Sequence, residues 1–110
     1  MVIVDTHCHI GLHIYEPVES LIYHIEHSRV EKAVLIQHNG TTDTSCHVEC
    51  LHHYPHCFES AIVVEETDNS SGIQKWADQG INGSRMAANS RAKDSDPLAH
   101  WRAGVELCRP

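Results

Sequence analysis

The chain has 110 residues, of which 41% are hydrophobic and only 5% aromatic, and 15 acidic against 8 basic residues give a net charge of −7 at pH 7. A single domain of this size can bury a core of aliphatic side chains, as in parallel sheets covered by helices. The acidic balance, without a Lys/Arg cluster, excludes nucleic acid and anionic membranes as expected partners. With no signal-peptide pattern and no apolar run of the ~20 residues that span a bilayer, we expect a cytoplasmic protein.

The first half of the sequence alternates between strand and helix patterns. An apolar strand over Val2–Thr6 is followed by a helix that Pro17 opens, and a continuous apolar run at Ala33–Ile36 predicts a strand buried on both faces. Ser45 is the expected N-cap of a second helix, which Pro55 ends. The apolar positions of these two helices are Val18, Leu21, Ile22 and Ile25, and then Val48 and Leu51.

The second half repeats the alternation. A strand is predicted over Phe58–Val64, then a short helix capped by one of the serines at 70–71 and ended by Gly80. A weaker fourth strand covers Ile81–Met86, and the Asp-Pro pair at 96–97 starts a last helix. The apolar positions of these helices are Ile73, Trp76 and Ala77, and then Leu98, Trp101, Val105 and Cys108 on one face. Four strand–helix units predict a single α/β domain over residues 1–110, with a parallel sheet and right-handed crossovers.

The end of the first strand carries an Asp-x-His-x-His pattern. Because side chains alternate between the two faces of a strand, we expect Ile3, Asp5, His7 and His9 to share one face. Two imidazoles spaced in this way can bind one metal ion, and the carboxyl end of a strand is where a parallel α/β fold opens its site. His7 and His9 are therefore the candidate metal ligands; the plainer interpretation is a pair of histidines bonded to loops.

Four segments resemble the amidohydrolase superfamily, in particular its amidohydrolase-2 branch. Residues 2–11, Val-Ile-Val-Asp-Thr-His-Cys-His-Ile-Gly, resemble its opening, and residues 30–37 resemble its second strand. Residues 54–58 resemble its Tyr-Pro-x-x-Phe entry to the third strand, and residues 76–86 its Trp…Gly…Gly-x-Arg fourth unit, although Ser84 stands where an aliphatic residue is usual. The resemblance implies a partial (β/α)8 TIM barrel, of which the chain supplies the first four units, with strands in the order 1-2-3-4 and helices on the outer face.

The resemblance also implies a chemistry. His7 and His9 would hold a divalent metal, Zn²⁺ foremost and Mn²⁺ or Fe²⁺ as alternatives, although some members of the branch work without metal. In the complete fold the metal activates water and an aspartate moves the proton. By the resemblance, this aspartate and the other metal ligands have no counterpart among residues 1–110. Arg85 would clamp a substrate carboxylate; the alternative is a solvated loop residue. His38 would line the same pocket; the alternative is a loop histidine. The expected substrate is a small carboxylic acid, ester, lactone or amide, and the reaction is hydrolysis or a related decarboxylation.

A His/Cys-rich helix offers an alternative function. Cys46 and Cys50 lie one turn apart, with His53 three residues further on, but no second cysteine pair is present to complete a structural zinc site. The five cysteines are an odd count and are expected to be reduced thiols. The alternative is a small non-catalytic α/β module that binds metal or a partner through this helix.

Four strands of an eight-stranded barrel would leave two strand edges unpaired and an apolar inner face uncovered. We therefore expect the isolated 110-residue chain to form homo-oligomers or to aggregate through these edges. We also expect it to bind metal substoichiometrically after dialysis and to lack hydrolase turnover by itself, because two imidazoles without supporting contacts bind weakly.

Overall fold

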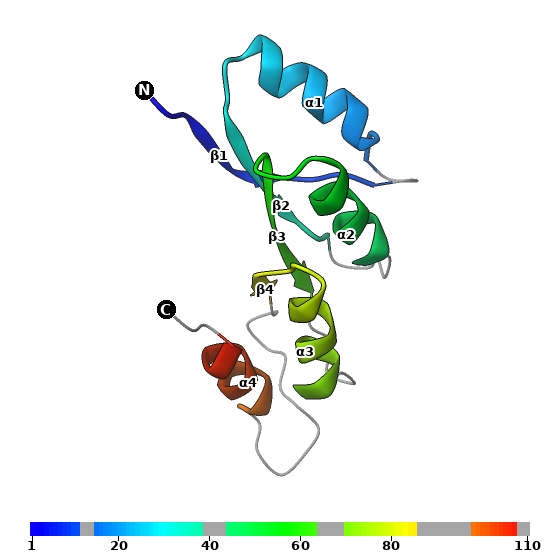
Figure 1. The fold of residues 1–110 in the computed structure, drawn as a ribbon, viewed down its shortest axis with the longest axis vertical. Coiled ribbons are helices and arrows are strands. Elements are labelled where there is room, and N and C mark those ends of the chain that lie inside the picture. The colour runs from blue at the N-terminus through cyan, green and yellow to red at the C-terminus, as the bar shows by residue number, and fades with distance from the viewer. Residues whose placement is uncertain (12–14, 39–43, 64–69, 86–97, 108–110) are drawn as a thin grey trace.

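Strands and helices alternate along the chain in the computed structural model, which describes residues 1–11, 15–38, 44–63, 70–85 and 98–107 (Figure 1). The elements are β1 (Val4–Cys8), α1 (Val18–His27), β2 (Lys32–Ile36), α2 (Thr44–His53), β3 (Phe58–Val63), α3 (Ser70–Asp78), β4 (Gly83–Arg85) and α4 (Ala99–Leu107). Among the described residues, the four predicted strand–helix units are all present. None of the described helices is both long and apolar enough to cross a membrane.

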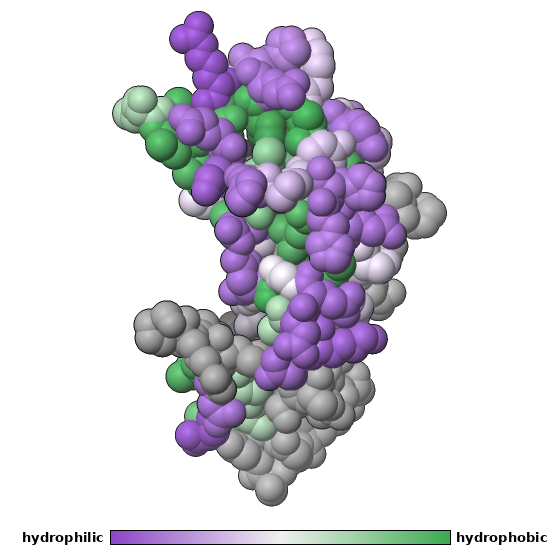
Figure 2. Space-filling view, viewed as in Figure 1, coloured by the Kyte–Doolittle hydropathy of each residue, from purple (hydrophilic) through white to green (hydrophobic). Residues whose placement is uncertain are grey.

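All four strands lie parallel in one sheet, in the order β1-β2-β3-β4. Each strand therefore neighbours the next one in the sequence, which is the order of a barrel and not of a doubly wound sheet. The predicted strand order is confirmed. β1 and β4 are the two edges, and the side chains of Val2, Ile3 and Val4 at the start of the β1 edge are exposed. Figure 2 shows hydrophobic side chains gathered at the end of the molecule that carries the N-terminus.

The core lies between the sheet and the helices α1 and α2. Its centre is Leu35, which is 0% exposed, and β2 and β3 also contribute Ala33 and Phe58 to it. Ile25 of α1 and Cys50 of α2 pack against these strand residues. A second, smaller cluster joins α2 and α3 to β3 through Val48, Ile62, Ile81 and Trp76. The helices therefore cover one face of the sheet, as the barrel interpretation predicts.

A layer of buried polar side chains crosses this core between α2 and the strands. The His47 Nδ1 atom and the Ser60 hydroxyl share a hydrogen bond of 2.7 Å, and both side chains are buried. The Gln37 amide donates to the Thr44 hydroxyl at 3.2 Å and accepts from the Val63 backbone N–H at 2.7 Å. Buried polar groups are tolerated when they are paired in this way, so these bonds fix how α2 sits on β2 and β3.

The first strand differs from its prediction, because it runs over Val4–Cys8 instead of Val2–Thr6. Asp5 pairs with Ala33 and Cys8 pairs with Leu35, so β1 holds one more residue than β2 between these two pairs. This irregularity, of the β-bulge type, shifts the alternation of side chains. Asp5 consequently lies on the same side of the sheet as Cys8, and the prediction that it shares a face with His7 and His9 is wrong.

The bulge brings the Asp5 carboxylate to two donors. The carboxylate accepts a hydrogen bond of 3.0 Å from the His7 backbone N–H and another from the Cys8 thiol, and both bonds lower the pKa of Asp5. Burial, together with the neighbouring Asp5 carboxylate, raises the pKa of Cys8 to about 11. The sulfur of Cys8 is therefore a protonated core group at neutral pH.

The end of the described sheet also differs from the sequence prediction. β4 covers only Gly83–Arg85, because Ile81 packs into the helix-side cluster before the strand begins. A Cβ atom at Gly83 would lie 2.9 Å from the Ala61 Cβ, so glycine allows β3 and β4 to approach closely. The predicted strand residues 64 and 86 lie outside the described residues.

The start of α2 can be compared with its sequence prediction, whereas the start of α4 cannot. α2 begins at Thr44, so Ser45 lies inside its first turn and is not the cap. The expected start of the last helix at 96–97 lies outside the described residues, as does Cys108. Trp101 and Val105 of α4 are exposed, as is Leu98 just before the helix, whereas Ala103 is buried.

Candidate active site

His7 lies within the bulge of β1, and His9 directly follows the carboxyl end of this strand. Their rings are 4.9 Å apart between centroids and nearly perpendicular, and His7 is exposed whereas His9 is partly buried. The Nδ1 atom of His9 lies 2.7 Å from the Ile36 carbonyl oxygen. Because a carbonyl oxygen can only accept, Nδ1 carries the proton and Nε2 keeps its lone pair. This second hydrogen bond to a backbone carbonyl is typical of metal-binding histidines.

Tyr15 and His38 complete an aromatic cluster around His9. The Tyr15 ring stacks on the His9 ring with centroids 4.8 Å apart, and the His38 ring lies 5.9 Å from His9 and 5.5 Å from Tyr15. His38 follows the end of β2, so the carboxyl ends of two adjacent strands meet here. Sequence reasoning missed Tyr15; the signal was an aromatic residue two positions before Pro17, where the chain returns from β1 into α1.

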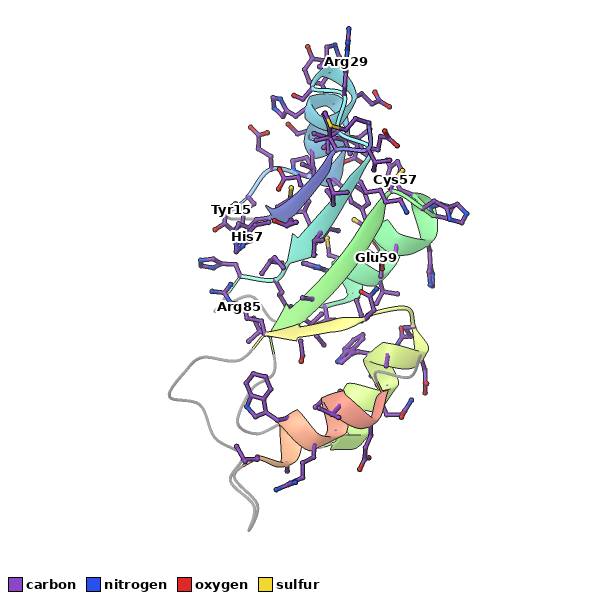
Figure 3. The ribbon with its side chains drawn as sticks, turned by 90° about the vertical axis from the view of Figure 1, so that its left-hand side faces the viewer. His7, Tyr15, Arg29, Cys57, Glu59 and Arg85 are labelled. Carbon is purple, nitrogen blue, oxygen red and sulfur yellow. The ribbon has the colours of Figure 1, made fainter. Side chains whose placement is uncertain are left out.

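Arg85 reaches the same edge of the sheet from β4. Its Nη1 atom donates a hydrogen bond of 3.2 Å to the Gln37 carbonyl oxygen, immediately before His38. The side chain thus crosses the end of β3 to reach β2. Figure 3 shows His7, Tyr15 and Arg85 on one side of the molecule, where the strands end. The guanidinium group has five N–H donors, of which this bond uses one, so the others can bind an anion.

The described residues contain no group of three or more His, Cys, Asp or Glu side chains placed to hold one metal ion. At the strand ends they offer two candidate ligands, His7 and His9, with His38 nearby. On α2 the His53 side chain is exposed and its Nδ1 atom bonds to the Glu49 carbonyl oxygen at 3.2 Å, while Cys50 packs into the core. Within the described part of the chain, therefore, a four-ligand zinc site is formed neither at the strand ends nor on α2.

The sequence matches no protein-family model and no curated protein. The fold does have a solved counterpart, the crystal structure of a probable 2-pyrone-4,6-dicarboxylic acid hydrolase from Acinetobacter baumannii with citric acid bound. The TM-score is 0.78 at 24% identity, and the match covers 97% of this chain and 47% of that one. The chain thus spans about half the length of this hydrolase, which is an amidohydrolase-2 TIM-barrel enzyme. The fold of this chain matches about half of such a barrel.

Proposed function

We propose that this chain forms the first half of the active site of a metal-dependent hydrolase of the amidohydrolase type, or of one of the related decarboxylases. The observation that carries the proposal is the convergence of His7, His9, His38 and Arg85 at the carboxyl ends of β1, β2 and β4. In a barrel fold this end of the strands carries the chemistry. The substrate class is a small carboxylic acid, ester, lactone or amide.

The two β1 histidines fit a metal by their donor chemistry. The His9 Nδ1–H bond to the Ile36 carbonyl leaves Nε2 available, and the adjacent His7 ring is exposed and close enough to share an ion. When bound, a divalent ion such as Zn²⁺, Mn²⁺ or Fe²⁺ supplies a Lewis acid and an activated water at neutral pH. Its remaining ligands would come from strands that follow in the complete barrel.

Arg85 is proposed to hold the substrate carboxylate. Its bond to the Gln37 carbonyl keeps the planar guanidinium group in a fixed orientation, which favours bidentate binding of a carboxylate. His38 follows the Gln37 carbonyl that Arg85 binds, and its ring lies 5.9 Å from that of His9, so it would line the space between the clamp and the metal. Fixed polar groups of this kind raise rate by orienting the reacting bond.

Paramagnetic Mn²⁺ tests the metal site without competition from the cysteines, because this hard ion avoids thiol ligands. We expect a titration of the 110-residue chain to broaden the NMR signals of His7 and His9 first, with weak, fast-exchanging binding. His7→Ala and His9→Ala should abolish the effect, whereas His24→Ala on the exposed side of α1 should not. Broadening that begins elsewhere, or that survives both substitutions, contradicts the proposed site.

Activity is tested by completing the barrel. We would fuse residues 1–110 to the second half of the matched hydrolase and screen small carboxylate esters and lactones. Metal binding should rise to one ion per chain, and His7→Ala should abolish it. Arg85→Gln should raise KM with a smaller effect on kcat, since the clamp binds a part of the substrate that does not react.

The mass of the protein in its source cells separates this proposal from the non-catalytic alternative. A mass of roughly twice 12.4 kDa or more supports a complete barrel. A mass near 12.4 kDa favours a small α/β module that acts through its His/Cys-rich helix.

A further inference from the structure

A hollow with two cysteines lies in the helix layer, on the sheet face opposite His7 and His9. It has a volume of about 190 Å³, and its walls come from α2, the start of α1 and the turn that follows β1. The residues that line it include Glu19, Cys46, Glu49 and Cys50. The proposed hydrolase uses none of these side chains.

Cys46 and Cys50 face each other within this hollow. They are one helical turn apart, which places them on the same face of α2, and their thiols are hydrogen-bonded to each other. Cys50 is 4% exposed and Cys46 is partly buried. Burial above all, and then the Cys46 thiol, raises the pKa of Cys50 to about 12, so that this thiol is protonated at neutral pH.

The two sulfur atoms are poorly placed for a disulfide. Residues four apart on a helix have Cβ atoms about 5–6 Å apart, whereas a disulfide needs about 3.5–4.5 Å. Oxidation would therefore require α2 to unwind, although the buried His47–Ser60 bond and the packing of Val48 hold it on the sheet. The pair is better suited to an ion that lies between the two sulfurs.

The charge of the hollow limits which ion can bind there. Glu19 and Glu49 line the same hollow, and both carboxylates act against ionisation of Cys50. An ion bound by both thiolates must therefore form sulfur bonds strong enough to outweigh this repulsion, which is a property of soft metal ions. Zn²⁺ requires a set of four ligands, which the described residues do not assemble here. Cu(I) is a soft ion that thiolates select and that accepts two sulfur ligands in a line.

We propose that Cys46 and Cys50 form a binding site for a soft, two-coordinate metal ion, Cu(I). Binding forms two S–Cu bonds, breaks two S–H bonds and releases two protons to solvent, without oxidation or reduction of either partner. The site does not depend on the proposed hydrolase function, because no residue is shared between the two.

The test is an anaerobic titration of the 110-residue chain with Cu(I) held by a competing chelator, bicinchoninate. We expect one Cu(I) per chain and at least a tenfold loss of affinity in Cys46→Ala and in Cys50→Ala. Cys57→Ala is the matched control, since Cys57 is also a free and partly buried cysteine outside the hollow. Binding that survives Cys46→Ala, or that is lost in Cys57→Ala or in His7→Ala, overturns the proposal.

A measurement on the unmodified chain guards against a variant that fails to fold. The metal-free chain should be alkylated by iodoacetamide at Cys46, the partly buried member of the pair, as read by peptide mass spectrometry. One equivalent of Cu(I) should protect Cys46 and should leave Cys57 reactive. Protection of Cys57 alone, or no protection of Cys46, overturns the proposal. An equal protection of Cys46 by one equivalent of Zn²⁺ overturns its selectivity for a soft ion.

Discussion

The helices cover one face of the sheet, and the histidines lie on the other face. The same strands form both faces, with different side chains. On the covered face, Ala33, Leu35 and Ser60 are almost completely buried. The alternate residues Val34 and Ile36 are only partly buried, and His7 is exposed. In this chain, the side chains that hold the fold together and the histidines that we propose to bind metal are therefore on opposite faces of one sheet. Changes on the two faces should have different effects on stability.

The largest difference is expected between two neighbouring residues of β2. Leu35→Ala removes the most buried side chain of the core and should lower the free energy of unfolding by about 2–5 kcal/mol. Val34→Ala, on the other face, should cost about 1 kcal/mol or less. Urea titrations followed by circular dichroism measure both values. Equal costs would mean that the second face is also packed against another part of the protein or a second copy.

A smaller effect is expected in the buried polar layer. Ser60→Ala removes the hydroxyl that shares a hydrogen bond with His47, and should destabilise the fold by about 1–3 kcal/mol. Ser84→Ala is the matched control on the neighbouring strand, where the serine is exposed, and should change stability by about 0.5 kcal/mol at most. If the two serine variants have the same stability, the bond to His47 does not hold α2 in place.

Alkaline pH should weaken the covered face through its buried thiols. The pKa values of Cys8 and Cys50 rise from 9.0 to about 11 and about 12 in the fold, so the unfolded chain loses these protons first. Stability is then fully present below pH 9 and falls above it, by about 1.4 kcal/mol per pH unit for each thiol. Unfolding under reducing conditions between pH 8 and about 10.5 measures the slope.

Cys50→Ala provides the control for this pH dependence, since it should reduce the slope above pH 9, whereas Cys57→Ala should leave it unchanged. If neither Cys8→Ala nor Cys50→Ala reduces the slope of unfolding free energy against pH, the loss of stability at alkaline pH comes from other groups.

The smallest effect on stability is expected at the metal-ligand candidate. His7→Ala removes an exposed ring and keeps the backbone N–H that bonds to Asp5, so stability should change by about 0.5 kcal/mol at most. The same substitution should abolish Mn²⁺ binding. A loss of stability comparable to that of Leu35→Ala would assign His7 a structural role.

The sequence pattern predicted the covered face better than the site. The apolar run at Ala33–Ile36 and the helical spacing of Val18 to Ile25 are local signals, and both elements formed within two residues of their predicted bounds. The bulge in β1 left no such signal, because the extra residue is visible only against the register of β2. Tyr15 was missed for a related reason, since its position beside His9 depends on the path of the chain between β1 and α1.

The polar layer also escaped sequence reasoning. His47 and Ser60 are polar residues, which are not expected in a core from the sequence alone. They become hydrogen-bond partners only because α2 packs on β3. The resemblance of four segments, opening with residues 2–11, to a known barrel family did predict the strand order, which the structure confirms. The roles of His7, His9, His38 and Arg85 remain predictions, although the structure brings these side chains to one edge.

The irregular pairing of β1 has a consequence for how insertions and deletions would act in this strand. Thr6 and His7 together stand opposite Val34, so one residue of β1 is surplus to the ladder. Deleting Thr6 would restore regular pairing and leave Cys8 opposite Leu35, with both histidines still on the open face. Deleting a residue inside Val34–Ile36 would instead turn the remainder of β2 over and exchange its two faces. We therefore expect β1 to tolerate the loss of one residue at Thr6 without moving the histidines, whereas β2 should not tolerate such a loss.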